Sequence, residues 1–551
     1  MAVYCSRSAL ATTVCILVLA GARHYPACPQ GKGVLQDSPA DVTALVELGS
    51  MYAEQGKPGL AEPLLARAVR ADPHSALARL EWATVLSKLH RYLKASAALQ
   101  GAPAPAARDK HIAYERLKAS IDLGLGHAGP AAADMERALE LAPADAGLQF
   151  ATGVAENQAG NWPRAIQLLG PIFQATHNEQ CGLLLIEAQL SARQSYRATL
   201  AALRAVSLPL QQEFALRVDI SRILAEHRLY AEAAKDLDRA VSLEPGYAEL
   251  LYDLALVDFR AGETRKALAA AERAKTIQDN ASLESLLGEI QEGDGDSLGA
   301  VRSFQSAVAL DPRREEYRLE LGLELLRHET LKPALLVFRQ GAQLFPRSYR
   351  MRVALGLTEY LLQDYRRATQ TLLGATALNP NPSLADAYLG ATQLEGPLAP
   401  DPGAVRYLCG YASAHQENAT AEAYCGAVLA RIEHDRGAPA PSSEALRRLS
   451  EAVARAPSSS IARCQLGKTL EWAQQWILAQ KQLEACIKLD PDSPDAYYLL
   501  AQVYKRLGEN RRAMQEITLH QQAALRMARA NGHRDRAVKR FLFSLERQPS
   551  H

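Results

Sequence analysis

The sequence predicts an all-α array of stacked helix pairs, and two observations support this fold class. Pro312, Pro346 and Pro380 lie 34 residues apart in the stretch 281–380. A fixed period in this range is typical of stacked repeats, because a single unit cannot bury its apolar face alone. Hydrophobic residues make up 48% of the 551 residues and aromatic residues only 6%, which fits helices rich in Ala and Leu. The length alone would suggest several globular domains, but the period favours a single array, because an array of repeats can be extended without forming separate cores.

Three positions within each 34-residue unit carry the same kind of residue. When the unit starts at Ala281, position eight is Gly, position twenty is Ala and position twenty-four is large and apolar. Small residues let helix backbones approach closely, and large residues fill the gaps between units. The residues are Gly288, Gly322 and Gly356, then Ala300, Ala334 and Ala368, then Phe304, Phe338 and Leu372.

This pattern resembles the tetratricopeptide repeat (TPR), a helix–turn–helix unit with small residues where helices touch and Pro at its end. The resemblance covers nearly all of residues 42–527 and implies a right-handed α-solenoid superhelix. It is most specific in the first unit, which carries Gly49, Ala61 and Leu65, in the block 281–380 and in the last two units. At 180–211 and 383–459 it depends on periodicity alone.

The first residues have the composition of a targeting segment. Arg7 precedes an apolar run, Ala9–Leu19, which ends in the small residues Ala20-Gly21-Ala22. This order resembles a secretory signal peptide cleaved after Ala22, and an uncleaved anchor is the alternative. The run is shorter than the ~20 residues of a membrane span. We therefore expect an exported protein of the envelope type, periplasmic or secreted, or a membrane-anchored one with its repeats outside the cytoplasm.

The helical period then continues along the chain with two weak regions. Prolines interrupt it at 396–403 and 437–442. The predicted order is a signal peptide or N-terminal anchor at 1–22, a linker at 23–40, a repeat array at 42–382 that is degenerate at 180–211, irregular helical repeats with Pro-rich loops at 383–459, a repeat pair at 460–527, and a capping helix and tail at 528–551.

The last of these segments is a basic amphipathic sequence. Ala537, Val538, Phe541, Leu542 and Leu545 alternate with Arg536, Lys539 and Arg540. A terminal repeat needs a polar outer face, so capping is the first interpretation. Contact with a membrane or a partner is the alternative.

The sequence predicts no enzyme and no cofactor. The net charge of +1 argues against nucleic-acid binding, which needs a basic surface. The string Gly124–Gly129 fits G-x-G-x-x-G but follows no strand, and 292–297 resembles a calcium loop without its final Glu. No nucleophile elbow occurs, and the 13 His form no pair at metal-ligand spacing. An enzyme with an unrecognised site in 383–459 is kept as an alternative.

Four of the eight cysteines suggest two disulfides. Cys409 and Cys425 are equally distant from one predicted turn, as are Cys464 and Cys486 from another. Residues equidistant from the turn of an antiparallel helix pair lie at the same height, so each pair can reach bonding distance. An exported location favours oxidation. The alternative is that these cysteines are small buried residues.

The TPR resemblance implies a concave face lined by the first helix of each unit. The Lys and Asn that chaperone-binding members use to hold a carboxylate are missing. An apolar groove suits an amphipathic helix or an extended segment, including one from another copy of this chain. The alternative is that tight packing buries the same residues. The predicted partner-binding groove consists of Tyr252, Leu256, Phe259, Leu319, Leu323, Val353, Leu357 and Tyr360.

The expected function is a non-catalytic scaffold for a protein or peptide partner, without nucleic acid, and with membrane contact only through an uncleaved N-terminal segment. The alternative is a membrane-tethered accessory subunit for envelope or enzyme-complex assembly. On the scaffold hypothesis, Leu323→Glu with Leu357→Glu abolishes partner capture and leaves the helices intact.

Overall fold

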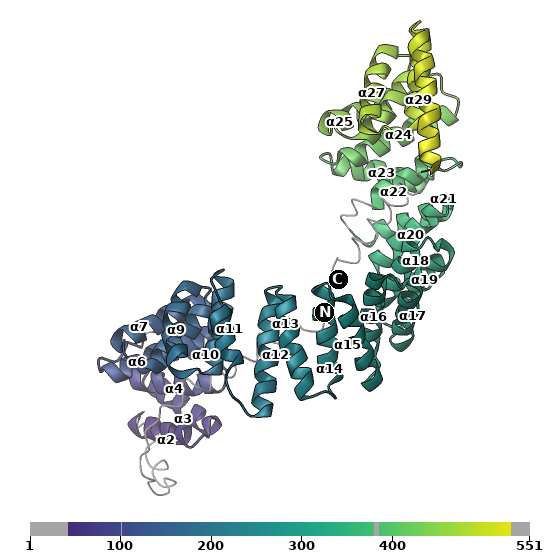
Figure 1. The fold of residues 1–551 in the computed structure, drawn as a ribbon. Helices are drawn as coiled ribbons and strands as arrows, with labels where there is room; N and C mark the ends of the chain where they lie inside the picture. Colours follow the sequence, from purple (N-terminus) through teal and green to yellow (C-terminus); the bar gives the residue numbers. More distant parts are fainter. Residues whose placement is uncertain (1–41, 101, 380–384, 530–551) are drawn as a thin grey trace. The chain divides into compact units, whose positions relative to one another are not determined.

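The computed structural model describes residues 42–100, 102–379 and 385–529, and in these ranges it contains 28 helices and no strand (Figure 1). This confirms the all-α repeat prediction. The chain divides into two compact units with the boundary between Ala261 and Gly262.

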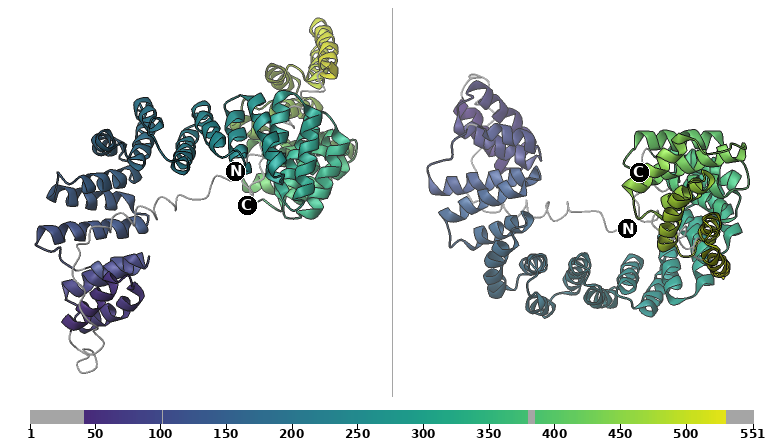
Figure 2. Two further views of the ribbon diagram at one scale, coloured as in Figure 1. Left: turned by 60° about the horizontal axis from the view of Figure 1, so that its bottom comes forward. Right: turned by 90° about the horizontal axis from the view of Figure 1, so that it is seen from above.

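The first unit consists of six consecutive helix pairs and one further helix (Figures 1 and 2). The helices are α2 (Val42–Glu54), α3 (Pro58–Ala71), α4 (Ala76–Lys88), α5 (Tyr92–Leu99), α6 (Arg108–Gly124), α7 (Ala128–Leu141), α8 (Ala146–Gln158), α9 (Trp162–Thr176), α10 (Glu179–Ser191), α11 (Arg197–Arg204), α12 (Leu210–Glu226), α13 (Tyr230–Leu243) and α14 (Ala248–Arg260).

The second unit begins with one helix and continues with seven pairs. The helices are α15 (Thr264–Ile277), α16 (Ala281–Asp294), α17 (Ser297–Leu310), α18 (Glu315–Arg327), α19 (Leu331–Leu344), α20 (Tyr349–Leu361), α21 (Tyr365–Thr376), α22 (Ala385–Glu395), α23 (Pro402–Ala414), α24 (Ala419–Asp435), α25 (Ser443–Arg455), α26 (Ser460–Trp472), α27 (Trp476–Leu489), α28 (Pro494–Arg506) and α29 (Asn510–Arg529).

The 34-residue period corresponds to one helix pair. The first helices α16, α18 and α20 begin at Ala281, Glu315 and Tyr349, at that spacing. Position eight is Gly because the large residue at position twenty-four of the same unit lies directly on it. A Cβ atom on Gly322 would lie 2.3 Å from the ring of Phe338, which is itself fully buried. A side chain there would displace that ring or separate the two helices.

The two weak regions are also helix pairs. In 180–211, the second helix α11 is only 8 residues long, yet Gly182 still lies against Leu203 and Phe173. In the described part of 383–459, the chain forms the four helices α22, α23, α24 and α25. The degenerate sequence therefore reflects altered turns and helix lengths and not a different fold.

Side chains of α24 hold both Pro-rich loops in place. Arg431 donates hydrogen bonds to the backbone carbonyls of Gln393 (2.7 Å), Gly396 (2.7 Å) and Leu398 (3.0 Å). Glu433 accepts one from the backbone N–H of Ser442 (2.9 Å). These contacts satisfy backbone groups that the prolines leave outside the helices.

The predicted signal peptide or anchor (1–22), the linker (23–40) and nearly all of the predicted capping segment (528–551) lie outside the described residues. Among the helices of the described ranges, none combines the length and the apolar character that a membrane-spanning helix requires.

Candidate functional site

The predicted groove residues of the first unit lie on one stripe of α14. Tyr252, Leu256 and Phe259 follow one another at helical spacing, and all three are half-buried. The opposite side of α14 is buried through Leu251 and Leu254. The stripe therefore keeps apolar surface within reach of a partner.

The predicted groove residues of the second unit are core residues, so their assignment to an accessible groove is wrong. Leu319, Leu323, Val353, Leu357 and Tyr360 are each at most 3% exposed. They belong to one hydrophobic cluster that also contains Leu389 of α22 and Leu408 of α23. The second unit therefore follows the alternative expectation, in which tight packing buries these residues.

Hydrogen bonds between successive first helices explain this burial. They join residues that are 33 to 35 positions apart, which is about one repeat. Because these bonds hold each first helix against the next, the apolar side chains between them are closed off. The pairs are Ser282 with Tyr317 (3.1 Å), Ser285 with Glu320 (2.6 Å), Ser348 with Glu315 (2.8 Å), Arg350 with Glu315 (3.1 Å) and Tyr360 with Glu395 (2.9 Å).

Carboxylates accompany the apolar stripe in the first unit. Burial, and then the neighbouring charge of Glu249, raises the pKa of Asp253 to about 6. Burial, and then the charge of Glu226, also raises the pKa of Glu187 on α10. Both shifts come mainly from burial, which disfavours the charged form, and the neighbouring carboxylates add to it.

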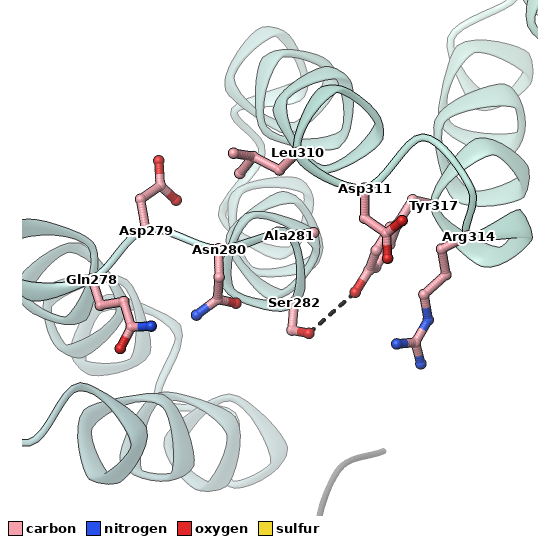
Figure 3. A pocket seen from close by; sticks show the side chains of 9 residues that line it. All are labelled: Gln278, Asp279, Asn280, Ala281, Ser282, Leu310, Asp311, Arg314 and Tyr317. Carbon is pink, nitrogen blue, oxygen red and sulfur yellow. Dashed lines mark hydrogen bonds between the residues drawn. The ribbon is translucent and has the colours of Figure 1, made fainter.

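An open pocket of about 640 Å³ lies at the N-terminal ends of α16 and α18 in the second unit (Figure 3). Asn280 caps α16, since its Oδ1 accepts a hydrogen bond from the backbone N–H of Leu283 (3.0 Å). The guanidinium of Arg314 lies 5.6 Å from the ring centroid of Tyr317. None of the predicted groove residues lines it. The lining residues are Gln278, Asp279, Asn280, Ala281, Ser282, Leu310, Asp311, Arg314 and Tyr317.

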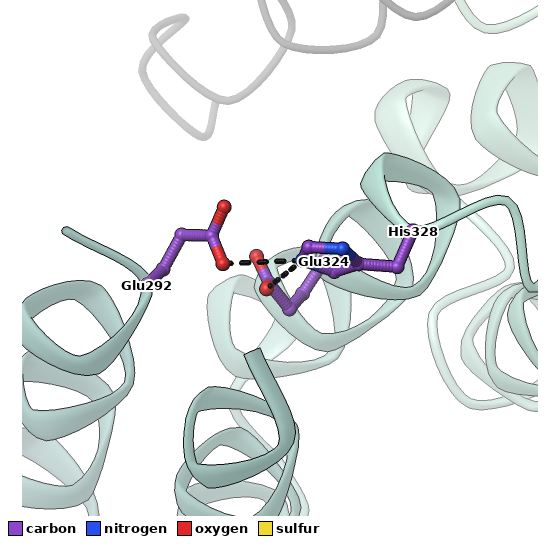
Figure 4. Close-up of side chains that lie close together, drawn as sticks. All are labelled: Glu292, Glu324 and His328. Carbon is purple, nitrogen blue, oxygen red and sulfur yellow. Dashed lines mark hydrogen bonds and ion pairs between the residues drawn. The ribbon is translucent and has the colours of Figure 1, made fainter. Parts of the chain in front are cut away.

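Two carboxylates and an imidazole meet between α16 and α18 (Figure 4). His328 Nε2 lies 3.1 Å from Glu292 Oε2 and 3.0 Å from Glu324 Oε1. Burial, and then the hydrogen bond and charge of Glu292, raises the pKa of Glu324 to about 7. Such donors can hold a divalent cation. However, Arg327 forms ion pairs with both carboxylates, so the cluster already contains a cation.

Pairs of His at metal-ligand spacing do not indicate this cluster, because it combines one His with two Glu. Glu324 and His328 are four residues apart on one helix, a spacing that is visible in the sequence. Glu292 joins them from the previous repeat, and only the 34-residue period could have indicated that neighbour.

The structure contains both expected disulfides, which lie in the second unit. Cys409 is joined to Cys425 with their Cα atoms 4.9 Å apart, and Cys464 to Cys486 with theirs 5.1 Å apart. Both distances suit a disulfide. Cys181, a free cysteine in the first unit, is buried, and this burial raises its pKa to about 11.

Known proteins resemble this chain in sequence. Models of the tetratricopeptide repeat match residues 482–515 and, with a second model, 32–76, 116–169 and 218–282. A BBSome complex member BBS4 homolog of Drosophila melanogaster is 24% identical over 174 residues, which are 31% of this chain. The match spans only 35% of that protein.

Solved structures resemble it more distantly. YrrB, described as a TPR protein with an unusual peptide-binding site, has a TM-score of 0.27 and 22% identity, covering 31% of this chain and 88% of its own. The APC/C hetero-tetramer Cut9–Hcn1 has a TM-score of 0.32 and 15% identity, covering 92% and 96%.

In two of the four matched segments a Gly lies on a large residue of the same unit, since Gly49 lies on Leu65 and Gly153 on Leu169. This chain is therefore a tetratricopeptide repeat protein.

Proposed function

We propose that this protein is a non-catalytic interaction scaffold that works outside the cytoplasm and binds a protein or peptide partner on α14. The TPR fold generally serves as a scaffold for protein interactions. One observation supports placing the partner site on α14. Tyr252, Leu256 and Phe259 are half-buried, whereas the corresponding residues of the second unit belong to the core.

The stripe on α14 favours a partner segment that is apolar and basic. Fully burying a large apolar side chain contributes about 1.5–3 kcal/mol, and the half-buried side chains of the stripe can still gain part of this from a partner. The carboxylates of Glu249 and Asp253 accompany the stripe and attract cations. An amphipathic helix with Lys or Arg beside its apolar face meets both requirements.

Export is supported by two features of the chain. The run Ala9–Leu19 followed by Ala20-Gly21-Ala22 has the order of a signal peptide. Two disulfides suit an oxidising compartment. N-terminal sequencing of the native protein tests this, because cleavage leaves a chain that starts at Arg23. A chain that still starts at Met1 favours the membrane-tethered alternative instead.

Partner capture tests the location on α14. The full chain, purified from its host after cross-linking, is compared with the double variant Leu256→Glu/Phe259→Glu. We expect capture of its partners to fall at least tenfold while the helical content by circular dichroism is unchanged.

Leu93→Glu is the matched control, because Leu93 is 78% exposed on α5 of the same unit. It should capture as much as the unchanged protein. Equal capture by the double variant contradicts the proposed location.

A further inference from the structure

We propose that the last three helix pairs of the second unit dock on an anionic lipid surface through one edge, which we call the turn edge. The turn edge comprises the three turns at which α24, α26 and α28 end and α25, α27 and α29 begin. These helices form the green-to-yellow block at the end of the described chain in Figure 1. The proposal goes beyond the proposed function, because it involves neither the partner site on α14 nor the N-terminal segment.

Ring contacts join the three turns. The imidazole of His434, near the end of α24, lies edge-on to the indole of Trp472, the last residue of α26, with their centroids 5.2 Å apart. The guanidinium of Arg506, the last residue of α28, lies 5.9 Å from the ring centroid of Trp476, the first residue of α27. Each turn therefore adjoins the next, and side chains of all three can meet one surface together.

Large apolar side chains lie in the middle turn. Ile477 and Leu478, on the first turn of α27, are 73% and 51% exposed. Trp472 and Trp476 lie on either side of the turn and are half-buried. Indole rings beside exposed aliphatic side chains suit the boundary between lipid headgroups and acyl chains, because the ring is buried there while its N–H still reaches polar groups.

Unpaired cations surround this apolar centre. Arg436, Lys505 and Arg511 are exposed, and none of them forms an ion pair with a residue that the structure describes. The acids of the turn edge, in contrast, lie beside cations of their own. An anionic surface is therefore attracted to this edge. The acids are Asp435, paired with Arg431 (3.4 Å), Glu509, paired with Arg512 (2.8 Å), and Glu471, which lies near Arg506.

An exposed apolar turn needs an occupant that accepts inserted side chains. Lipid headgroups can move aside for Ile477 and Leu478, whereas a protein partner would need a preformed cavity for them. Headgroups also supply negative charge around the inserted turn, which matches the cations on the first and third turns. A lipid surface therefore fits the turn edge better than a protein does.

The turn between α16 and α17 provides a matched comparison within the same unit. Leu298 is the second residue of α17, as Ile477 is of α27, and it is 76% exposed. However, it follows Asp294 and Asp296, and the sequence has no Lys or Arg from 276 to 301. An anionic surface would be repelled by this turn, so exposure of an apolar residue at this position is not sufficient.

Quenching of fluorescence by brominated lipids tests the contact in the full chain. Trp472 and Trp476 are two of the four Trp of the sequence. We expect vesicles of equal parts phosphatidylglycerol and phosphatidylcholine, brominated on their acyl chains, to quench the protein. The variant Trp472→Phe/Trp476→Phe should abolish this quenching. Brominated vesicles of phosphatidylcholine alone should not quench, and equal quenching by them overturns the assignment to an anionic surface.

Co-sedimentation with the same vesicles measures the two contributions separately. Ile477→Glu/Leu478→Glu should weaken binding about fivefold or more, because the inserted groups become charged. Lys505→Gln/Arg511→Gln should weaken it about threefold or more and reduce its dependence on salt. Leu298→Glu is the control and should bind as the unchanged protein does. Circular dichroism should show the same helical content in every variant, since each of these side chains is exposed.

Two results overturn the proposal. Vesicle binding that persists in Ile477→Glu/Leu478→Glu and quenches no Trp would belong to the N-terminal segment. Absence of vesicle binding also overturns it, and loss of a cross-linked protein in that double variant would then make the turn edge a protein site. The proposed function is tested separately, because Leu256→Glu/Phe259→Glu leaves the turn edge unchanged.

Discussion

Leu256, Leu323 and Leu357 occupy the same position, position nine, of the first helix in three repeats, yet their environments differ. In the first unit, Leu256 of α14 is half-buried. In the second unit, Leu323 and Leu357 are 2% and 0% exposed within a cluster that extends to α22 and α23. The same residue at the same repeat position is thus part of a surface in one unit and of a core in the other.

The difference shows that the neighbouring repeats, and not the residue itself, decide whether the inner face is open. In the second unit, hydrogen bonds such as Ser285 to Glu320 and Tyr360 to Glu395 hold the first helices against one another. The ring of Tyr388 on α22 then lies edge-on to Tyr360, with their centroids 5.8 Å apart. Polar contacts of this kind hold neighbouring first helices together, so that the inner face of these repeats becomes part of the packed core.

The largest expected effect comes from placing a charge at this position in each unit. Leu357→Glu buries a carboxylate without a partner, and we expect it to destabilise the second unit by about 4 kcal/mol or more. Leu256→Glu should change the unfolding free energy of the first unit by no more than about 1 kcal/mol. Urea unfolding followed by circular dichroism gives the stability, and limited proteolysis assigns the loss to a unit.

Similar unfolding midpoints for the two variants would mean that the two positions are equally open. The burial of Leu323 and Leu357 also overturns the expectation that Leu323→Glu with Leu357→Glu abolishes capture and leaves the helices intact. That double variant is expected to lose the fold of the second unit, so its loss of capture would say nothing about a groove.

The repeat fold could be predicted from the sequence because its strongest constraint is local. Gly322 must be small since Phe338 lies on it, and the two are always sixteen residues apart in a regular unit. The cysteine pairs could be predicted for the same reason, because equal distance from a turn fixes equal height.

The candidate site could be predicted only in part. Tyr252, Leu256 and Phe259 are half-buried, but nothing in their residue types distinguishes them from the core residues Leu319, Leu323 and Val353. The burial of the latter residues depends on contacts between neighbouring repeats, and the sequence of a single repeat does not determine those contacts. The boundary between the two compact units, after Ala261, could not be predicted from the sequence either, since Gly262 occupies an ordinary turn position of its repeat.

The second expected effect concerns the disulfides, which occur in the second unit of the described chain. Cys409 and Cys425 are 16 residues apart, and Cys464 and Cys486 are 22 apart. Closing a loop of this size contributes about 3 kcal/mol. Reduction with dithiothreitol should therefore lower the urea midpoint of the second unit and leave the first unit unchanged. Intact mass before and after reduction provides the check: each pair must gain two hydrogen atoms, and an unchanged mass refutes the pairing.

The smallest expected effect is a change with pH in the stability of the second unit. Because the pKa of Glu324 rises from its ordinary value of 4.5 to about 7 on folding, the folded second unit binds this proton more tightly than the unfolded chain does. Stability from this group is therefore fully present below about pH 4.5 and is lost as the pH rises to about 7. Gln cannot ionise, so Glu324→Gln should stabilise the second unit at pH 8 and have little effect at pH 4.5. One pKa unit corresponds to about 1.4 kcal/mol.

We expect a gain of about 1 kcal/mol at pH 8, because the variant also loses the ion pair with Arg327 and the contact with His328. Asp294→Asn is the matched control, an exposed acid at the end of α16 whose loss should change neither pH dependence nor stability. Urea midpoints at pH 4.5, 6 and 8 measure the effect. If the variant is less stable than the unchanged protein at pH 8, then the ionised Glu324 is stabilised by its contacts with Arg327 and His328, and these two residues also contact Glu292 on α16. In that case the polar contacts between first helices, and not the apolar cluster, keep the inner wall of the second unit closed.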